Sequence, residues 1–116
     1  MRAYQIVSTD GFEDLRRIER PQPEAGPGQV VVRVRACSLN YRDTIIVRGG
    51  YPRNDTRPVV PLSDGAGDVV AVGAGVGGWK AGDRVCVNFL RDWTAGAITE
   101  PVMHTCLGGS IDGMLS

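Results

Sequence analysis

The amino-acid sequence predicts a mainly β fold, a barrel or a sandwich with a single core. Its 116 residues include 16 glycines and seven prolines, a composition that disfavours long helices. The apolar runs are only four to eight residues long, which is the length of ordinary strands. A chain of this size buries roughly two thirds of its unfolded surface, so we expect one domain that folds without disulfides.

The first expected element is an N-terminal hairpin. Residues 2–7 alternate weakly between polar and apolar side chains, and a second run at 15–19 follows turn residues at 9–11. The next segment, 21–29, holds three prolines and two glycines. Because proline donates no backbone hydrogen bond, this segment is predicted to be a loop.

The clearest strand is VVVRVRAC at residues 30–37. Its apolar side chains alternate with two arginines, so one face is apolar and the other basic: Val32, Val34 and Ala36 against Arg33 and Arg35. A period of two over eight residues predicts a strand that is buried on one face.

Residues 39–48 are the one good helix candidate. Asn40 is a favourable N-cap, Asp43 lies in the first turn, and Gly49 and Gly50 end the segment. An asparagine followed three residues later by an acidic residue resembles a capping box. The same spacing also places an amide and a carboxylate on one helix face, where both can meet a ligand.

The whole chain is organised around residues 61–87, where two β-branched runs, 68–72 and 84–87, flank a GxGxxG pattern at 73–78. That pattern binds a dinucleotide only when a helix follows it. Here a turn at 80–83 leads into the next β-branched run. We therefore predict a hairpin with a glycine-rich loop and no cofactor cradle.

The remaining segments carry weaker signals. Residues 51–60 are a loop by composition, and 89–116 are predicted to be a long surface excursion with one short strand. Leu115 and Ser116 resemble the start of another strand, which leads us to expect a domain that is incomplete at its C-terminus.

Charge and cysteine content narrow the class of protein. Thirteen basic and thirteen acidic residues give a net charge of zero, which disfavours nucleic acid and membrane surfaces as partners. Small molecules or other proteins are the expected partners. No apolar run approaches the ~20 residues of a membrane span. Three widely spaced cysteines and an N-terminus without an apolar signal segment indicate the cytoplasm.

The residues also disfavour metal-dependent and nucleophilic chemistry. The one histidine is His104, and Cys37, Cys86 and Cys106 have no CxxC spacing, so a closed zinc site is not expected. No serine has a histidine in a recognisable pattern, so nucleophilic catalysis has no support.

Three segments together resemble the N-terminal GroES-like domain of medium-chain dehydrogenases/reductases: VVVRVRACSLNYRDTIIVRGGYP, PLSDGAGDVVAVGAGV and KAGDRV. The similarity runs from Met1 to about Val87, and LGGSIDG is similar to the segment by which that family's chain returns to its barrel. The resemblance implies a partly open GroES-like β-barrel with one short helix near 40–48. It also implies that NADPH or NADH binds to a Rossmann domain absent from this chain.

The resemblance bears on zinc. In the zinc alcohol dehydrogenases of this superfamily a cysteine ligand stands at the position matching Asn40, and a Gly-His-Glu motif matches Leu62, Ser63 and Asp64. Cys37 lies three residues too early to replace that ligand. The four-cysteine lobe that follows GDRV in those enzymes is missing as well. The resemblance therefore implies a zinc-independent member.

The Asn-aromatic-basic-Asp motif is similar to that of quinone oxidoreductases, acryloyl-CoA reductase-like proteins and enoyl reductase modules. The resemblance implies hydride transfer to a conjugated carbonyl in a full-length protein, with this fragment inactive by itself. It implies that the motif lies beside nicotinamide and substrate, where it hydrogen-bonds and places charge as an enolate develops: Asn40, Tyr41, Arg42 and Asp43. Ser63 and Asp64 are implied to be close to the substrate or cofactor.

Two alternatives stay open. The chain is then either a stand-alone GroES-like module that binds proteins or self-associates through open strand edges, or part of a zinc alcohol dehydrogenase with atypical ligands.

Overall fold

The computed structural model describes residues 1–8, 10–52 and 58–116. Part of the predicted loop at 51–60 and one residue of the predicted turn at 9–11 lie outside the described residues. The strands and helices are β1 (Arg2–Ile6), a 3₁₀ turn (Phe12–Asp14), β2 (Leu15–Glu19), β3 (Val30–Ser38), α1 (Tyr41–Val47), β4 (Asp64–Val72), β5 (Arg84–Cys86) and α2 (Glu100–Met103). The predicted mainly β class with a short helix is confirmed. In the described part of the chain no helix is long and apolar enough to cross a membrane.

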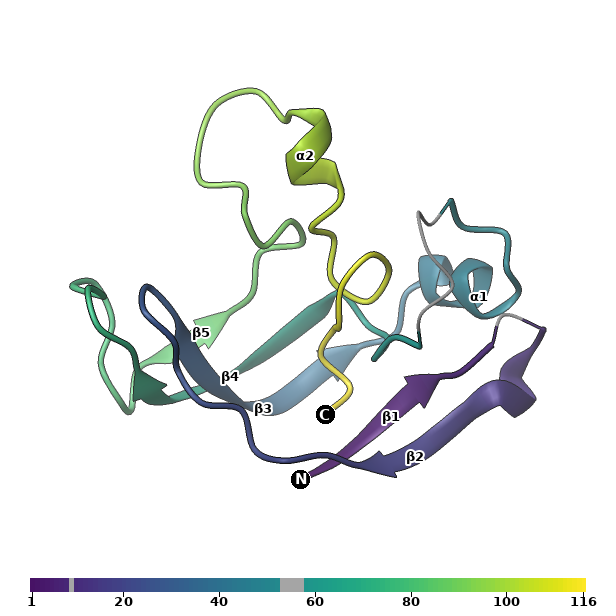
Figure 1. Cartoon of the computed structure of the whole chain (residues 1–116), viewed down its shortest axis with the longest axis horizontal. Coiled ribbons are helices and arrows are strands. Elements are labelled where there is room, and N and C mark those ends of the chain that lie inside the picture. Colours follow the sequence, from purple (N-terminus) through teal and green to yellow (C-terminus); the bar gives the residue numbers. More distant parts are fainter. Residues whose placement is uncertain (9, 53–57) are drawn as a thin grey trace.

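The strands form two antiparallel sheets, β1–β2 and β3–β4–β5. In Figure 1 the two sheets lie beside each other, with the C-terminal residues between β1 and β3. The Tyr4 N–H donates to the Leu115 carbonyl at 3.0 Å, which ties these residues to β1. The N-terminal hairpin predicted from the sequence is confirmed, with Arg2 opposite Glu19 in its register.

The predicted strand at 30–37 is confirmed as β3, but its apolar face is uneven. Val32 and Val34 are half-buried and the two arginines are exposed, as expected. Ala36, which was predicted to share the buried face, is exposed. The register with β4 shifts between Val34 and Ala36, and one extra residue in a strand turns the following side chains to the other face.

The GxGxxG segment is the loop of the β4–β5 hairpin, as predicted. A turn at 80–83 leads directly into β5, whose Val85 pairs with Gly67. A side chain at Gly73 would overlap the Gly26 carbonyl oxygen, and the Gly73 N–H donates to the Gln29 carbonyl at 2.8 Å. This glycine is therefore required because two loops approach closely, with no part in a dinucleotide cradle.

A small apolar core holds α1 against the β1–β2 sheet. It consists of Ile6, Ile46, Val47 and Val59, with Leu15 and Tyr51 packed against it. The core joins β1, β2 and α1 to the segment that precedes β4. The N-terminus of α1 is thereby held in a fixed position next to the first residues of β4.

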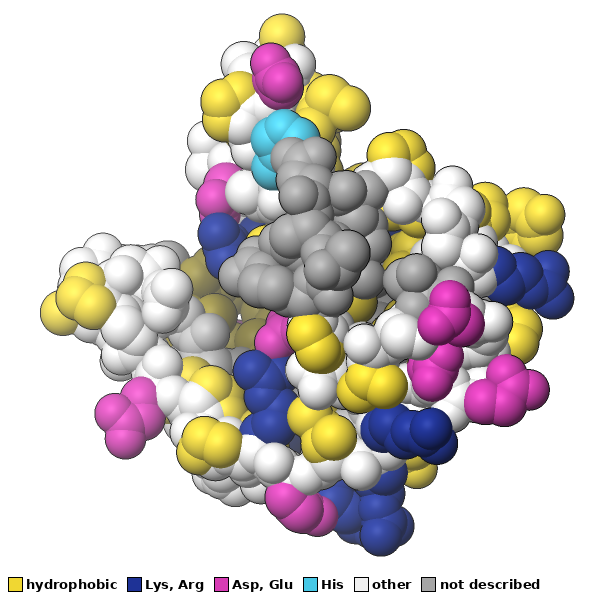
Figure 2. All heavy atoms as spheres, turned by 45° about the vertical axis from the view of Figure 1, so that its right-hand side comes forward, with side chains coloured by type: hydrophobic (Ala, Val, Ile, Leu, Met, Phe, Trp, Pro, Cys, Tyr) yellow, Lys and Arg dark blue, Asp and Glu magenta, His cyan; other side chains and the backbone are white. Residues whose placement is uncertain are grey.

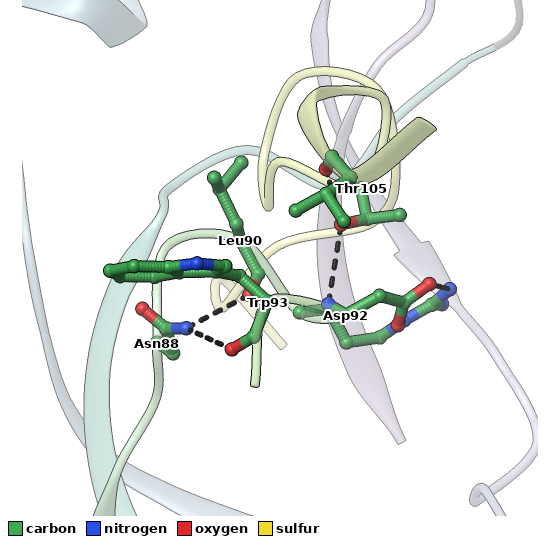
Figure 3. A network of polar contacts seen from close by, with 7 residues as sticks. Asn88, Leu90, Asp92, Trp93 and Thr105 are labelled. Carbon is green, nitrogen blue, oxygen red and sulfur yellow. Dashed lines mark hydrogen bonds and ion pairs between the residues drawn. The ribbon is translucent and has the colours of Figure 1, made fainter. Parts of the chain in front are cut away.

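The prediction of a surface excursion over 89–116 is wrong for its second half. Its first half is a loop closed by hydrogen bonds (Figure 3). Asn88 Nδ2 donates to the Leu90 and Trp93 carbonyls at 3.0 and 3.1 Å. The Asp92 N–H donates to Thr105 Oγ1 at 3.2 Å.

The chain then returns to the interior. Cys106 is 3% exposed and Met114 8% exposed, because Cys106 pairs with Leu90 and the Met114 N–H bonds the Leu62 carbonyl. The expected short strand is replaced by isolated bridges and the four-residue helix α2.

Candidate functional site

The candidate site is built on the N-terminus of α1. Asn40 precedes the helix in an extended conformation, and its N–H donates to Asp43 Oδ2 at 2.8 Å. This is the carboxylate part of the predicted capping box. Asp43 is only 8% exposed, and its Oδ1 is buried with no hydrogen-bond partner among the described residues.

The first residues of β4 meet this helix end. Asn40 Nδ2 donates to Asp64 Oδ2 at 2.5 Å, and Ser63 Oγ donates to the same oxygen at 2.8 Å. Ser63 is buried, whereas Asp64 is exposed. Three residues selected from the sequence thus form one hydrogen-bonded group, in which Asn40 lies 24 positions before Asp64 and Ser63 is next to it.

Tyr41 lies beside this group and is 79% exposed. Leu39, on the other side of Asn40, is 82% exposed. The residues before and after Asn40 thus expose an aliphatic side chain and a phenol to solvent. This part of the site offers hydrogen-bond donors next to apolar surface, which suits an organic carbonyl compound.

Arg42 is directed away from the Asn40 group. Its Nη1 donates to the Leu107 carbonyl at 3.0 Å and its Nη2 to Cys106 Sγ at 3.2 Å. The guanidinium lies 4.4 Å from the ring centre of Tyr51 and 4.8 Å from that of Phe89. Arg42 therefore fastens α1 to the returning C-terminal segment.

Cys106 is a feature that sequence reasoning did not single out. Burial alone raises the pKa of its thiol, but hydrogen bonds from Ser110 and Tyr51 and the charge of Arg42 together lower it. Its Sγ lies 3.3 Å from Ser110 Oγ and 3.8 Å from the Tyr51 hydroxyl. A side chain at Gly109 would overlap Arg42 Nη2, so glycine at this position lets the guanidinium reach Cys106.

The donor atoms do not fit the family's catalytic zinc. Among the described residues, no group of three or more His, Cys, Asp and Glu side chains is placed to hold a metal ion. At the matching positions Asn40, Ser63 and Asp64 supply an amide, a hydroxyl and a carboxylate, and these hydrogen-bond one another. Catalytic zinc in proteins is usually bound by thiolates and imidazoles as well as carboxylates.

Exposed side chains of the described residues carry charges of both signs. On the face in Figure 2, basic and acidic side chains are interspersed with apolar ones. This distribution agrees with the net charge of zero.

Comparison with known proteins gives concordant results. The family model described as the alcohol dehydrogenase GroES-like domain matches residues 26–116. A zinc-type alcohol dehydrogenase-like protein of Schizosaccharomyces pombe is 45% identical over 104 residues, which are 89% of this chain and 30% of the relative. The acryloyl-coenzyme A reductase of Metallosphaera sedula is 40% identical over 122 residues, covering 100% of this chain and 36% of the relative.

A solved structure is also similar. The cobalt- and zinc-bound thermostable alcohol dehydrogenase from Pyrobaculum aerophilum has a TM-score of 0.83 and 29% identity, over 98% of this chain and 36% of that one. The chain thus spans about a third of the length of these relatives.

Proposed function

Since the chain belongs to the alcohol dehydrogenase GroES-like domain family of the medium-chain dehydrogenases/reductases, we propose that it is the substrate-side domain of an NAD(P)H-dependent reductase. The reaction is hydride transfer to a conjugated carbonyl compound without a metal. The relative named acryloyl-coenzyme A reductase acts, by its name, on such a compound.

The hydrogen-bonded group of Asn40, Ser63 and Asp64 is the observation that carries this proposal. It occupies the positions at which the family's zinc enzymes carry ligands. The Asn40 amide donates to Asp64, so its Nδ2 is fixed toward that carboxylate. An amide nitrogen has two N–H donors, and one of them is left for a substrate oxygen.

The nicotinamide cofactor, when bound to the remainder of the protein, supplies the hydride. In the reaction the hydride forms a bond to the β-carbon of the substrate. The electron pair of the carbon–carbon double bond shifts, and negative charge develops on the carbonyl oxygen. A proton then adds to the α-carbon.

In this chain Asn40 Nδ2 and the Tyr41 hydroxyl are assigned to donate hydrogen bonds to that oxygen. Asn40 Nδ2 is oriented before the reaction begins by its hydrogen bond to Asp64, and a donor held in this way stabilises the developing charge. Arg42 and Asp43 act as positioning residues, since one fastens α1 to residues 106–107 and the other caps the helix that carries Asn40.

The test substitutes Asn40 by serine in the full-length parent protein. Serine is a good N-cap, so α1 keeps its cap while the amide donor is lost. We expect kcat for an enone or quinone to fall about 100-fold, the effect of losing one such donor. An unchanged kcat with a folded variant would contradict the role of Asn40.

A second candidate function is self-association through an open strand edge. In the described part of the chain β3 pairs with β4 alone, so its other edge is unpaired over nine residues. Sedimentation at increasing concentration tests this candidate. A concentration-dependent dimer that neither binds nicotinamide nor regains activity with a separately supplied Rossmann domain would favour it over the reductase.

A further inference from the structure

We propose that the outer face of the β3–β4–β5 sheet binds the oxyanion end of an extended substrate between Arg35 and Arg84. The identity of this ligand as a substrate rests on the proposed reductase function. The binding site itself does not.

Two arginines share one carboxylate on this sheet. Asp68 lies in the middle of β4; Arg35 Nε from β3 is 2.8 Å from its Oδ2, and Arg84 Nε from β5 is 3.7 Å from its Oδ1. Two guanidinium groups facing one carboxylate leave a local excess of one positive charge. The side chains of Arg35 and Arg84 are 59% and 88% exposed, so an incoming anion can reach them.

The geometry leaves donors for that anion. Both arginines approach Asp68 through Nε, so the two terminal nitrogens of each guanidinium are not used on this carboxylate. Planar guanidinium groups bind phosphate and carboxylate through such paired N–H donors. The hydrogen bond from Arg35 lowers the pKa of the Asp68 carboxyl, partial burial opposes this, and the charges of both arginines add to it. Asp68 is therefore ionised and holds both arginines at neutral pH.

Two open hollows of the sheet surface that share Ala66, together called the trough here, lie between this arginine pair and the candidate site. One hollow of about 500 Å³ is lined by Arg35, Gly67, Asp68 and Arg84, and it adjoins a second of about 350 Å³ through Ala66. The second hollow reaches Asp64, the partner of Asn40. The three strands lie side by side here, as Figure 1 shows.

The floor of the trough is made of small side chains. Ala36, Ala66 and Cys86 face one another across the three strands in register. Asp64 and Asp68 are four residues apart on β4, and the described residues of β4 that line the hollows between them are Gly65, Ala66 and Gly67. At ~3.3 Å per residue, the distance along the strand from Asp64 to Asp68 is about 13 Å. The trough therefore fits a substrate whose oxyanion lies about that distance from the reacting carbonyl, with an apolar chain between them.

The test is an NMR titration of the ¹⁵N-labelled chain with hexyl phosphate, with hexanoate as the carboxylate arm and hexanol as the neutral control. We expect saturable shifts of the Ala66, Asp68 and Arg84 amides with one or both anions and none with hexanol. Substitution R84Q is expected to weaken binding about tenfold, the loss of one charge-assisted contact. R91Q is the matched control, because Arg91 is also exposed and paired with a carboxylate, that of Asp92.

Two results would overturn the site: no saturable shift with either anion, or equal binding by wild type and R84Q. The spectrum of each variant reports its folding in the same experiment. Because no catalysis is measured, a failed activity assay of the parent would refute the reductase proposal and leave this site standing.

Discussion

The first turn of α1 has two sides with different roles. Asn40 and Tyr41 are directed toward the start of β4 and the solvent, whereas Arg42 and Asp43 are held inside by the protein's own groups. The four residues are consecutive in one motif, yet Arg42 and Asp43 bind groups of the domain itself, so only the first two are proposed to contact a substrate. The contacts that each residue of a transferred motif makes within the domain therefore have to be known before catalytic roles are assigned.

If the two pairs of residues have these different roles, the largest expected effect is a loss of unfolding free energy on substitution of Arg42. Replacing Arg42 by alanine removes two hydrogen bonds and two ring contacts, and should lower the free energy of unfolding by about 3 kcal/mol. Arg48 is the matched control in the same segment, since it is exposed and its guanidinium lies 5.4 Å from the ring centre of Phe12. R48A should cost about 0.5 kcal/mol. Urea denaturation measures both, and equal losses would mean that Arg42 is not a positioning residue.

Tyr41 should show the opposite behaviour. Its phenol is exposed and is assigned to the substrate oxygen, so Y41F should leave the urea midpoint unchanged. In the full-length parent kcat should fall about tenfold, because one of two donors to the developing charge is lost. If Y41F loses stability but retains kcat, Tyr41 stabilises the fold and does not contact the substrate.

Asp43 should produce a smaller loss of stability than Arg42. The substitution D43N keeps the shape of the side chain and removes its charge near the positive end of α1. We expect about 1 kcal/mol of destabilisation in urea, with the weaker cap as its cause. Stability equal to the wild type would show that the buried carboxylate has no capping function.

The smallest effect concerns Cys106 and pH. Its folded-state pKa is lowered, so in the alkaline range the unfolded chain binds more protons and stability rises with pH. The contribution is fully present above the unfolded pKa and is lost as pH falls through the folded one. In C106S this alkaline rise should disappear, which urea titrations at several pH values measure. A rise of the same size in C106S would assign it to another group.

Local patterns in the sequence were enough to predict the N-terminal hairpin, β3, the helix with its Asn40 cap and the β4–β5 hairpin. Each of these depends on neighbours along the chain: period-two alternation, a capping pair, or glycines before a turn. The GxGxxG pattern lies in the loop of the predicted β4–β5 hairpin, where Gly73 allows a close approach to Gly26.

The contacts that were not predicted are long-range ones. Nothing near Arg42 in sequence indicates that its guanidinium meets Cys106, 64 residues away. The burial of Cys106 and Met114 likewise depends on Leu90 and Leu62, which lie in other segments. The bulge that exposes Ala36 follows from pairing with β4, which the alternation within β3 does not record.

The most direct test of the central claim is reduction by the full-length parent protein, with NADPH and a panel of quinones, enones and alcohols, with and without a chelator. The hydrogen-bonded Asn40–Asp64–Ser63 group predicts reduction of conjugated carbonyl compounds at the same rate in both conditions. Alcohol oxidation that is lost with the chelator and restored by zinc would contradict the metal-free account.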